Sequence, residues 1–155
     1  MSKAFTKDDV PDAPPLGRHR APLPAGVANY VTPRGLDALR QELTELDGTP
    51  ATDARTRAAW RAELEDRMAT AVVPPPPTDR SEIRFGARVR VRKTDGRVRD
   101  LQIVGVDEAA PNDGRIAFVA PLARALLGRR IGEAVSVRTP GGEEDLEILA
   151  VAYSP

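Results

Sequence analysis

Three carboxylates gather in one short stretch between two segments of apolar periodicity. Glu45, Asp47 and Asp53 stand on either side of Gly48 and Pro50. Carboxylate oxygens are hard ligands that suit Mg2+, and an ion held in this way can activate water for hydrolysis. Asp53 has a second explanation, because an acidic residue at the start of a helix stabilises that helix. The residues alone leave both explanations open.

A basic group follows these carboxylates along the chain. Arg55, Arg57, Arg61 and Arg67 could meet RNA phosphates or the acidic surface of a protein partner. Acidic residues interleave with them, so a solvated face with salt bridges explains the pattern as well. Trp60, within the same segment, favours packing between helices over stacking on a base.

The residues that other kinds of catalytic site require are missing from the sequence. The chain has no cysteine and one histidine, His19, so it offers no thiol nucleophile, disulfide or zinc site. We therefore expect no metal site and no cofactor of its own. The absence of cysteine fits a cytoplasmic protein. The formal net charge is zero, which gives no general attraction to nucleic acid, and we expect no sequence-specific DNA binding.

No apolar run approaches the roughly 20 residues that span a bilayer, so we expect no association with a membrane.

The carboxylates and arginines must be positioned by a helical hairpin over residues 29–72. Thr32 can cap a helix that begins with Pro33, and apolar residues then recur at spacings of three and four. Gly48 and Pro50 end this helix, and a second one begins after Thr52 or Asp53. The residues expected to form the seam are Leu36, Leu39, Leu43, Leu46, Ala58, Trp60, Leu64, Met68 and Ala71.

The segments around the hairpin are rich in proline. Residues 1–28 have no apolar periodicity, which is typical of a disordered tail. Residues 73–82 contain four consecutive prolines, which cannot continue a helix and form a stiff spacer. The sequence therefore predicts that the hairpin and the rest of the chain are separate compact units.

Residues 83–155 change to a period of two, which predicts a small antiparallel α+β domain. Thr94-Asp95-Gly96 predicts a hairpin turn, Leu122–Leu127 a short helix, and Gly128 its C-terminal cap. The expected strands include Val89 and Val91 and lie around 101–106, 115–119, 134–138 and 146–153.

Four motifs in these segments resemble the Gre family of bacterial transcript-cleavage factors. They are Tyr-Val-Thr-Pro-Arg-Gly-Leu at 30–36, Ile-Val-Gly-Val-Asp-Glu at 103–108, Pro-Leu-Ala-Arg-Ala-Leu-Leu at 121–127 and Thr-Pro-Gly-Gly at 139–142. The resemblance implies an FKBP-like fold for the C-terminal domain. It also implies an accessory factor, not an enzyme, whose partner is RNA polymerase.

The resemblance further implies a docking surface. In Gre proteins the loop before the proline-started helix contacts the rim of the polymerase secondary channel. The matching residues here are Val119, Ala120, Pro121 and Leu122, with Arg124 beside them. The alternative is that Val119 and Leu122 simply belong to the core.

The family's cleavage chemistry sits at the hairpin tip, where an Asp-Leu-x-Glu-Asn type motif helps to hold a second Mg2+ of the polymerase. This chain lacks that motif and offers only Glu45, Asp47 and Asp53 there, with Arg55, Arg57 and Arg61 as candidate contacts to nascent RNA. At about 1.5 Å per residue the arms span roughly 22 and 27 Å, about half the family length. We expect binding at the secondary channel with weak or no stimulation of cleavage, and any Mg2+ would be shared with the polymerase.

Three alternatives remain at this point. A Rnk-type regulator, which also has a shortened hairpin, would compete with Gre factors. An interaction module of FKBP-like fold would have no tie to transcription. A prolyl isomerase would need an aromatic pocket for which no residues are evident.

Overall fold

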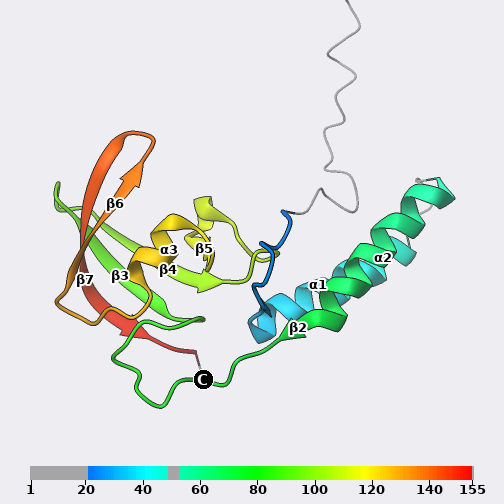
Figure 1. Cartoon of the computed structure of the whole chain (residues 1–155), viewed down its shortest axis with the longest axis horizontal. Helices are drawn as coiled ribbons and strands as arrows, with labels where there is room; N and C mark the ends of the chain where they lie inside the picture. The colour runs from blue at the N-terminus through cyan, green and yellow to red at the C-terminus, as the bar shows by residue number, and fades with distance from the viewer. Residues whose placement is uncertain (1–20, 49–52, 155) are drawn as a thin grey trace, which may run out of the picture.

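The structure is a computed structural model that describes residues 21–48 and 53–154. A helical hairpin projects from a curled five-stranded sheet that carries one short helix (Figure 1). The predicted α+β class is confirmed. Within the described residues, no helix is long and apolar enough to cross a membrane.

Both helices of the hairpin begin where the caps predict. Helix α1 (Pro33–Asp47) starts after Thr32, whose hydroxyl accepts a hydrogen bond from the Gly35 amide at 2.9 Å. Helix α2 (Ala54–Thr70) starts after Asp53, whose carboxylate accepts one from the Thr56 amide at 3.0 Å. The two helices pack antiparallel through a small apolar cluster of Leu39, Leu43, Leu46, Trp60, Leu64 and Met68.

Two predicted seam positions are wrong. Ala58 is exposed, because it falls off the stripe in which Trp60, Leu64 and Met68 follow one another at spacings of four. Ala71 lies beyond the end of α2, in strand β2 (Ala71–Val72).

A short parallel strand pair closes the base of the hairpin. Strand β1 (Asn29–Tyr30) pairs with β2, and the Asn29 side-chain amide donates to the Arg67 carbonyl at 2.9 Å. Strands of two residues are too short to show a period, so no pattern in the sequence predicts them. The pair fixes where the hairpin leaves the rest of the chain.

The five-stranded sheet has the order β5-β4-β3-β7-β6. Three of its pairs are antiparallel, as predicted, but β4 and β5 are parallel. A parallel pair needs a crossover connection, which here runs through residues 105–114 and includes a short 3-10 turn at Pro111–Asp113. The strands are β3 (Arg88–Lys93), β4 (Val98–Val104), β5 (Arg115–Ala117), β6 (Ala134–Thr139) and β7 (Gly142–Ala152).

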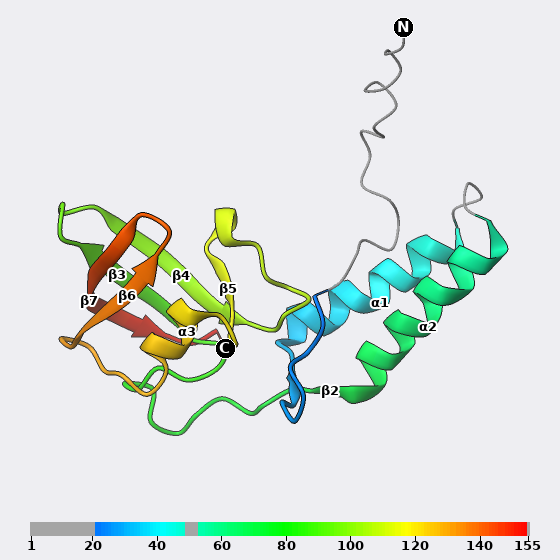
Figure 2. The ribbon, with the colours of Figure 1, turned by 45° about the horizontal axis from the view of Figure 1, so that its top comes forward.

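Helix α3 (Pro121–Leu126) covers one face of the sheet (Figure 2). Its Ala123 and Leu126 are buried in the main core with Val89, Ile103 and Ile148. After the helix, Gly128 adopts a φ of 85°, and its amide donates to the Ile83 carbonyl at 2.8 Å. The C-cap is Leu127, and Gly128 follows it in the left-handed conformation that glycine commonly adopts just past a helix end.

The linker contains no helix or strand between Val73 and Pro77. Its far end is tied to the turn after α3, where the Arg130 guanidinium contacts Asp79 at 2.8 Å and Ser81 at 2.6 Å. Hydrogen bonds from Ser81 and the nearby Arg130 lower the pKa of Asp79 to about 2. The linker is therefore anchored where it enters the sheet domain.

The structure describes only the last part of the predicted tail of residues 1–28. Residues 1–20, with His19, lie outside the described residues. Residues 21–28 include a turn in which the Val27 amide donates to the Pro24 carbonyl at 3.2 Å. The carbonyl of Ala21 accepts a hydrogen bond from the Arg67 guanidinium at 2.6 Å.

A buried polar cluster, which we call the clamp, joins the hairpin to the sheet domain. Its members are Thr32, Arg67, Asp107 and Glu108. Arg67 pairs with Asp107 at 3.1 Å, and both side chains are 8% exposed. The Thr32 hydroxyl donates to the Glu108 carboxylate at 2.5 Å. The two units are therefore held together by a direct interface as well as by the linker, which the sequence did not predict.

Close backbone contact accompanies the clamp. At Gly105, which follows β4, a Cβ would lie 2.4 Å from the Tyr30 carbonyl oxygen. The Tyr30 ring meets Phe85 and Phe118 at centroid distances of 5.7 and 5.5 Å. Only glycine allows the hairpin base to approach the end of β4 so closely.

We expect Gly105→Ala to lower the free energy of unfolding by about 1–3 kcal/mol, because the new methyl group meets backbone that cannot rotate away. Gly141→Ala is the matched control, since a Cβ there would lie 3.8 Å from the Thr139 hydroxyl, an ordinary contact. Urea unfolding followed by Trp60 fluorescence measures both variants. Equal stability of the two variants would contradict the close contact.

Candidate functional site

The loop between β5 and α3 presents a fixed, partly exposed surface. The Phe118 amide donates to the Val104 carbonyl at 2.8 Å, and the Ala120 amide to the Ala117 carbonyl at 2.9 Å. Pro121 then begins α3, where its ring restricts the backbone and its missing amide is not needed. Such a loop needs little ordering on contact with a partner.

The five residues predicted for docking divide into two groups. Ala120 and Leu122 pack partly against the main core, so the alternative explanation holds in part for Leu122. Val119 is half-buried, while Pro121 and Arg124 are exposed. The surface available to a partner therefore depends mainly on Val119, Pro121 and Arg124.

One exposed apolar residue beyond the C-terminal end of α3 was missed by sequence reasoning. Ile131 lies in the turn between α3 and β6 and is 52% exposed. Arg129, two residues before it, is also exposed. The available signal was an isoleucine next to Gly132 in a turn, where an apolar side chain has no core to enter.

The acidic residues at the hairpin tip are engaged within the hairpin. Asp47 forms an ion pair with Arg61, which also lies 3.9 Å from Glu65. Glu45 accepts a hydrogen bond from the Gln41 amide at 3.2 Å. The Asp47–Arg61 pair ties the end of α1 to α2.

Asp53 serves as the cap of α2. Its carboxylate accepts from the Thr56 amide at 3.0 Å and from the Thr56 hydroxyl at 2.7 Å. These hydrogen bonds favour the charged form and lower the pKa of Asp53. Residues 49–52 lie outside the described part of the chain. Across the part that is described, no group of three or more His, Cys, Asp or Glu side chains could hold a metal ion.

The arginines of α2 do not form one surface. Arg55 is exposed and Arg57 is half-buried. Arg61 pairs with acids of both helices, as expected for a salt-bridged face. Arg67 departs from that explanation, because it is buried in the clamp.

The clamp connects the two candidate surfaces. Asp107 and Glu108 follow β4. Their partners lie at the base of the hairpin, Thr32 just before α1 and Arg67 near the end of α2. Phe118, which contacts Tyr30, directly precedes the β5–α3 loop. The direction of the hairpin is thus fixed relative to the loop, and Figure 2 shows the hairpin pointing away from the sheet.

Comparison with known proteins gives consistent matches. The family described as "Transcription elongation factor, GreA/GreB, C-term" matches residues 77–153. The chain is 31% identical over 153 residues to transcription elongation factor GreB of Neisseria meningitidis serogroup B, covering 81% of this chain and 94% of that protein. It is 43% identical over 94 residues to GreA of Sinorhizobium medicae, covering 59% of this chain and 60% of that protein.

A solved structure of GreA factor homolog 1 from Thermus thermophilus is also similar. The match has a TM-score of 0.44 at 21% identity and covers 81% of this chain and 99% of that chain. A TM-score of that size is too low to support an inference about function.

The alignment with GreB has more positions than the number of residues of this chain that it includes. It runs over 153 residues, whereas 81% of 155 residues is about 126. About 27 positions of that relative therefore stand opposite gaps in this chain.

We expect Arg67→Met to release the hairpin from its fixed direction, because the buried Asp107 carboxylate loses the adjacent guanidinium. Breaking a buried pair in this way costs about 3–5 kcal/mol. The chain has no native cysteine, so single cysteines at Ala62 and Arg138 can carry spin labels. Pulsed electron paramagnetic resonance should give a broader distance distribution for the variant.

Arg40→Met is the matched control, because its ion pair with Asp37 is exposed and contributes little. A distribution as narrow in Arg67→Met as in Arg40→Met would show that the clamp does not set the direction of the hairpin.

Proposed function

Because the chain belongs to the GreA/GreB family of transcription elongation factors, we propose that it binds RNA polymerase at the rim of the secondary channel and regulates elongation there without strongly stimulating transcript cleavage. The observation that carries the second half of this proposal is the short hairpin, whose tip carboxylates are engaged in helix capping and ion pairing. The protein is an accessory factor, and it acts in the bacterial cytoplasm.

Docking uses the β5–α3 loop. Val119 and Pro121 offer a small apolar contact, and Arg124 adds a charge that can meet an acidic polymerase surface. Ile131 can extend the apolar contact beyond α3. Since loop hydrogen bonds already fix this surface, little conformational entropy is lost on binding.

The clamp directs the hairpin into the channel once the loop is docked. Helices α1 and α2 have 15 and 17 residues, which at the helical rise is roughly 22 and 25 Å. Because Mg2+ accepts oxygen ligands only at about 2 Å, a carboxylate that stops short of the active centre contributes nothing to hydrolysis. Asp53 would also have to give up its hydrogen bonds to Thr56.

A Rnk-type competitor of Gre factors is the second candidate. The short helices favour it. Such a competitor would dock on the polymerase in the same way as the first candidate. It would differ in regulating transcription only by occupying the secondary channel. Family membership argues against an interaction module unrelated to transcription and against a prolyl isomerase.

Replacing Pro121 and Arg124 together with glutamate should weaken binding to RNA polymerase by about tenfold or more, because a new negative charge faces an acidic partner surface. Leu122 is kept, since it packs on the core. Arg138→Glu is the control, being exposed on β6 away from the loop. Surface plasmon resonance with immobilised polymerase measures all three proteins. Full binding by the double variant would place the docking surface elsewhere.

On backtracked elongation complexes we expect little RNA shortening and competition against a full-length Gre factor. Asp47→Ala and Asp53→Ala should leave the residual cleavage rate unchanged, because both carboxylates serve the hairpin. Gel analysis of labelled RNA gives the rate. Strong shortening that is lost in either variant would mean that the tip is catalytic.

A further inference from the structure

Two adjoining cavities lie between the base of the hairpin, the linker and the exposed face of the sheet. Each has a volume of about 430 Å3. Arg34, Arg88 and Gln102 line both, so the cavities meet at these three side chains. Sites for small molecules commonly occupy about 300–1,000 Å3.

One cavity is apolar and has rigid walls. The prolines of the linker at 74–77 form one side, and Val73, which is 41% exposed, adjoins them. Phe85 is held in an edge contact with Phe118 at 5.6 Å. The Tyr153 hydroxyl donates to the Glu82 carbonyl at 2.5 Å and accepts from the Arg84 amide at 2.8 Å, which fixes its ring. These walls suit a flat, largely apolar ring system.

The junction between the cavities carries uncompensated positive charge. Over residues 21–48 and 53–154, the guanidinium groups of Arg34 and Arg88 make no hydrogen bond or ion pair with another residue. Several other arginines of the sheet and of its β3–β4 turn have acidic partners. Arg90 pairs with Asp100 at 2.8 Å, Arg92 with Glu147 at 2.7 Å and Arg97 with Asp95 at 2.8 Å.

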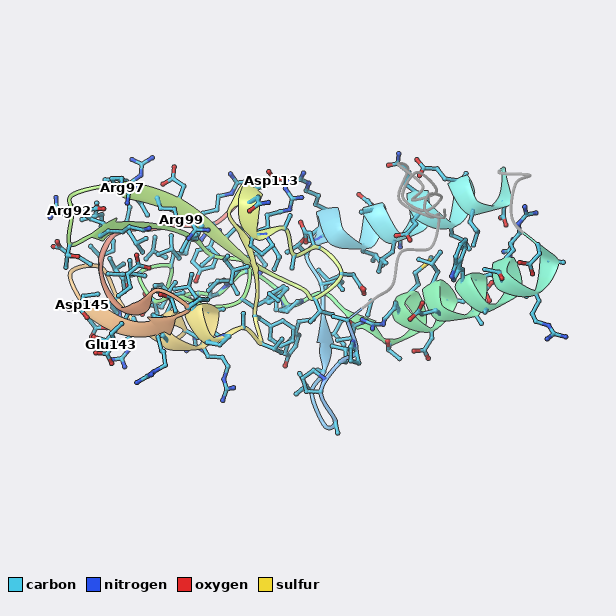
Figure 3. All side chains as sticks on the ribbon, turned by 90° about the horizontal axis from the view of Figure 1, so that it is seen from above. Arg92, Arg97, Arg99, Asp113, Glu143 and Asp145 are labelled. Atoms are coloured by element: carbon cyan, nitrogen blue, oxygen red, sulfur yellow. The ribbon has the colours of Figure 1, made fainter. Side chains whose placement is uncertain are left out.

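Figure 3 shows Arg92 and Arg97 at the end of the sheet away from the hairpin. Arg115, which lines the polar cavity, is also engaged, since it donates to the Glu108 carbonyl at 3.2 Å. The guanidinium groups of Arg34 and Arg88 therefore lie at the junction of the two cavities, beside the apolar one. Guanidinium groups bind phosphate oxygens through paired hydrogen bonds.

We propose that this groove binds a nucleoside di- or triphosphate, with its phosphates on Arg34 and Arg88 and its base against the proline wall. The Gln102 amide can both donate to and accept from the sugar or the base. Two adjacent guanidinium groups match the several negative charges of linked phosphates better than the single charge of one carboxylate. The site is separate from the β5–α3 loop and does not depend on polymerase binding.

The test uses the full chain and two fluorescently labelled nucleotides, one of adenosine and one of guanosine triphosphate, followed by fluorescence polarisation. We expect saturable binding by at least one of them. Arg34→Ala and Arg88→Ala should each weaken it about tenfold or more. Arg138→Ala, also an exposed arginine on the sheet, should leave it unchanged. Val73→Glu places a charge beside the apolar cavity, so it should weaken binding of the nucleotide. It should have a smaller effect on the affinity with which pyrophosphate competes.

Several results would overturn the proposal. One is the absence of saturable binding at millimolar concentrations. Another is an equal effect of Arg88→Ala and Arg138→Ala on nucleotide affinity. A third is that pyrophosphate competes as well as the unlabelled nucleotide. A short polyglutamate peptide that competes better than the nucleotide would assign the groove to an acidic peptide. Circular dichroism of each variant shows whether it is folded.

Discussion

The buried ion pair between Arg67 and Asp107 is the contact on which the arrangement of this protein depends. Taking two charges out of water is costly, and the cost is offset only when both partners stay in place. The Ala21 carbonyl satisfies a second donor of Arg67, and the Thr32–Glu108 hydrogen bond lies at the other arm of the hairpin. The clamp therefore specifies one direction for the hairpin more than it adds to overall stability.

Local features of the fold could be predicted from the sequence because single residues determine them. Thr32 and Asp53 cap helices, Gly96 and Gly128 adopt positive φ, and Pro121 begins α3. The clamp could not be predicted in the same way. Arg67 belongs by sequence to a solvated basic helix face, and only the approach of the β4–β5 connection to the hairpin base buries it. The strand at β5 was predicted, but its parallel pairing with β4 was missed for the same reason, since its partner is chosen by a crossover.

The same distinction between features set by single residues and features set by tertiary contacts applies to the candidate functional site. The β5–α3 loop was found from its motif, but its apolar residues were not separable by sequence into core and surface, and only the structure assigns Leu122 partly to the core. At the tip, the acidic residues were found but not their partners. Asp47 is held by Arg61 and Asp53 by Thr56. Capping and ion pairing occupy the carboxylates that metal binding would need.

A fixed direction and a short reach together make the central claim, that a docked hairpin stops before the active centre of the polymerase. The most direct measurement is a cryo-electron microscopy structure of this protein on a backtracked elongation complex. We predict the β5–α3 loop at the rim of the channel and every tip carboxylate on the order of 10 Å or more from the catalytic Mg2+, far beyond the coordination distance of about 2 Å. A carboxylate of Asp47 or Asp53 bound to that ion would contradict the account.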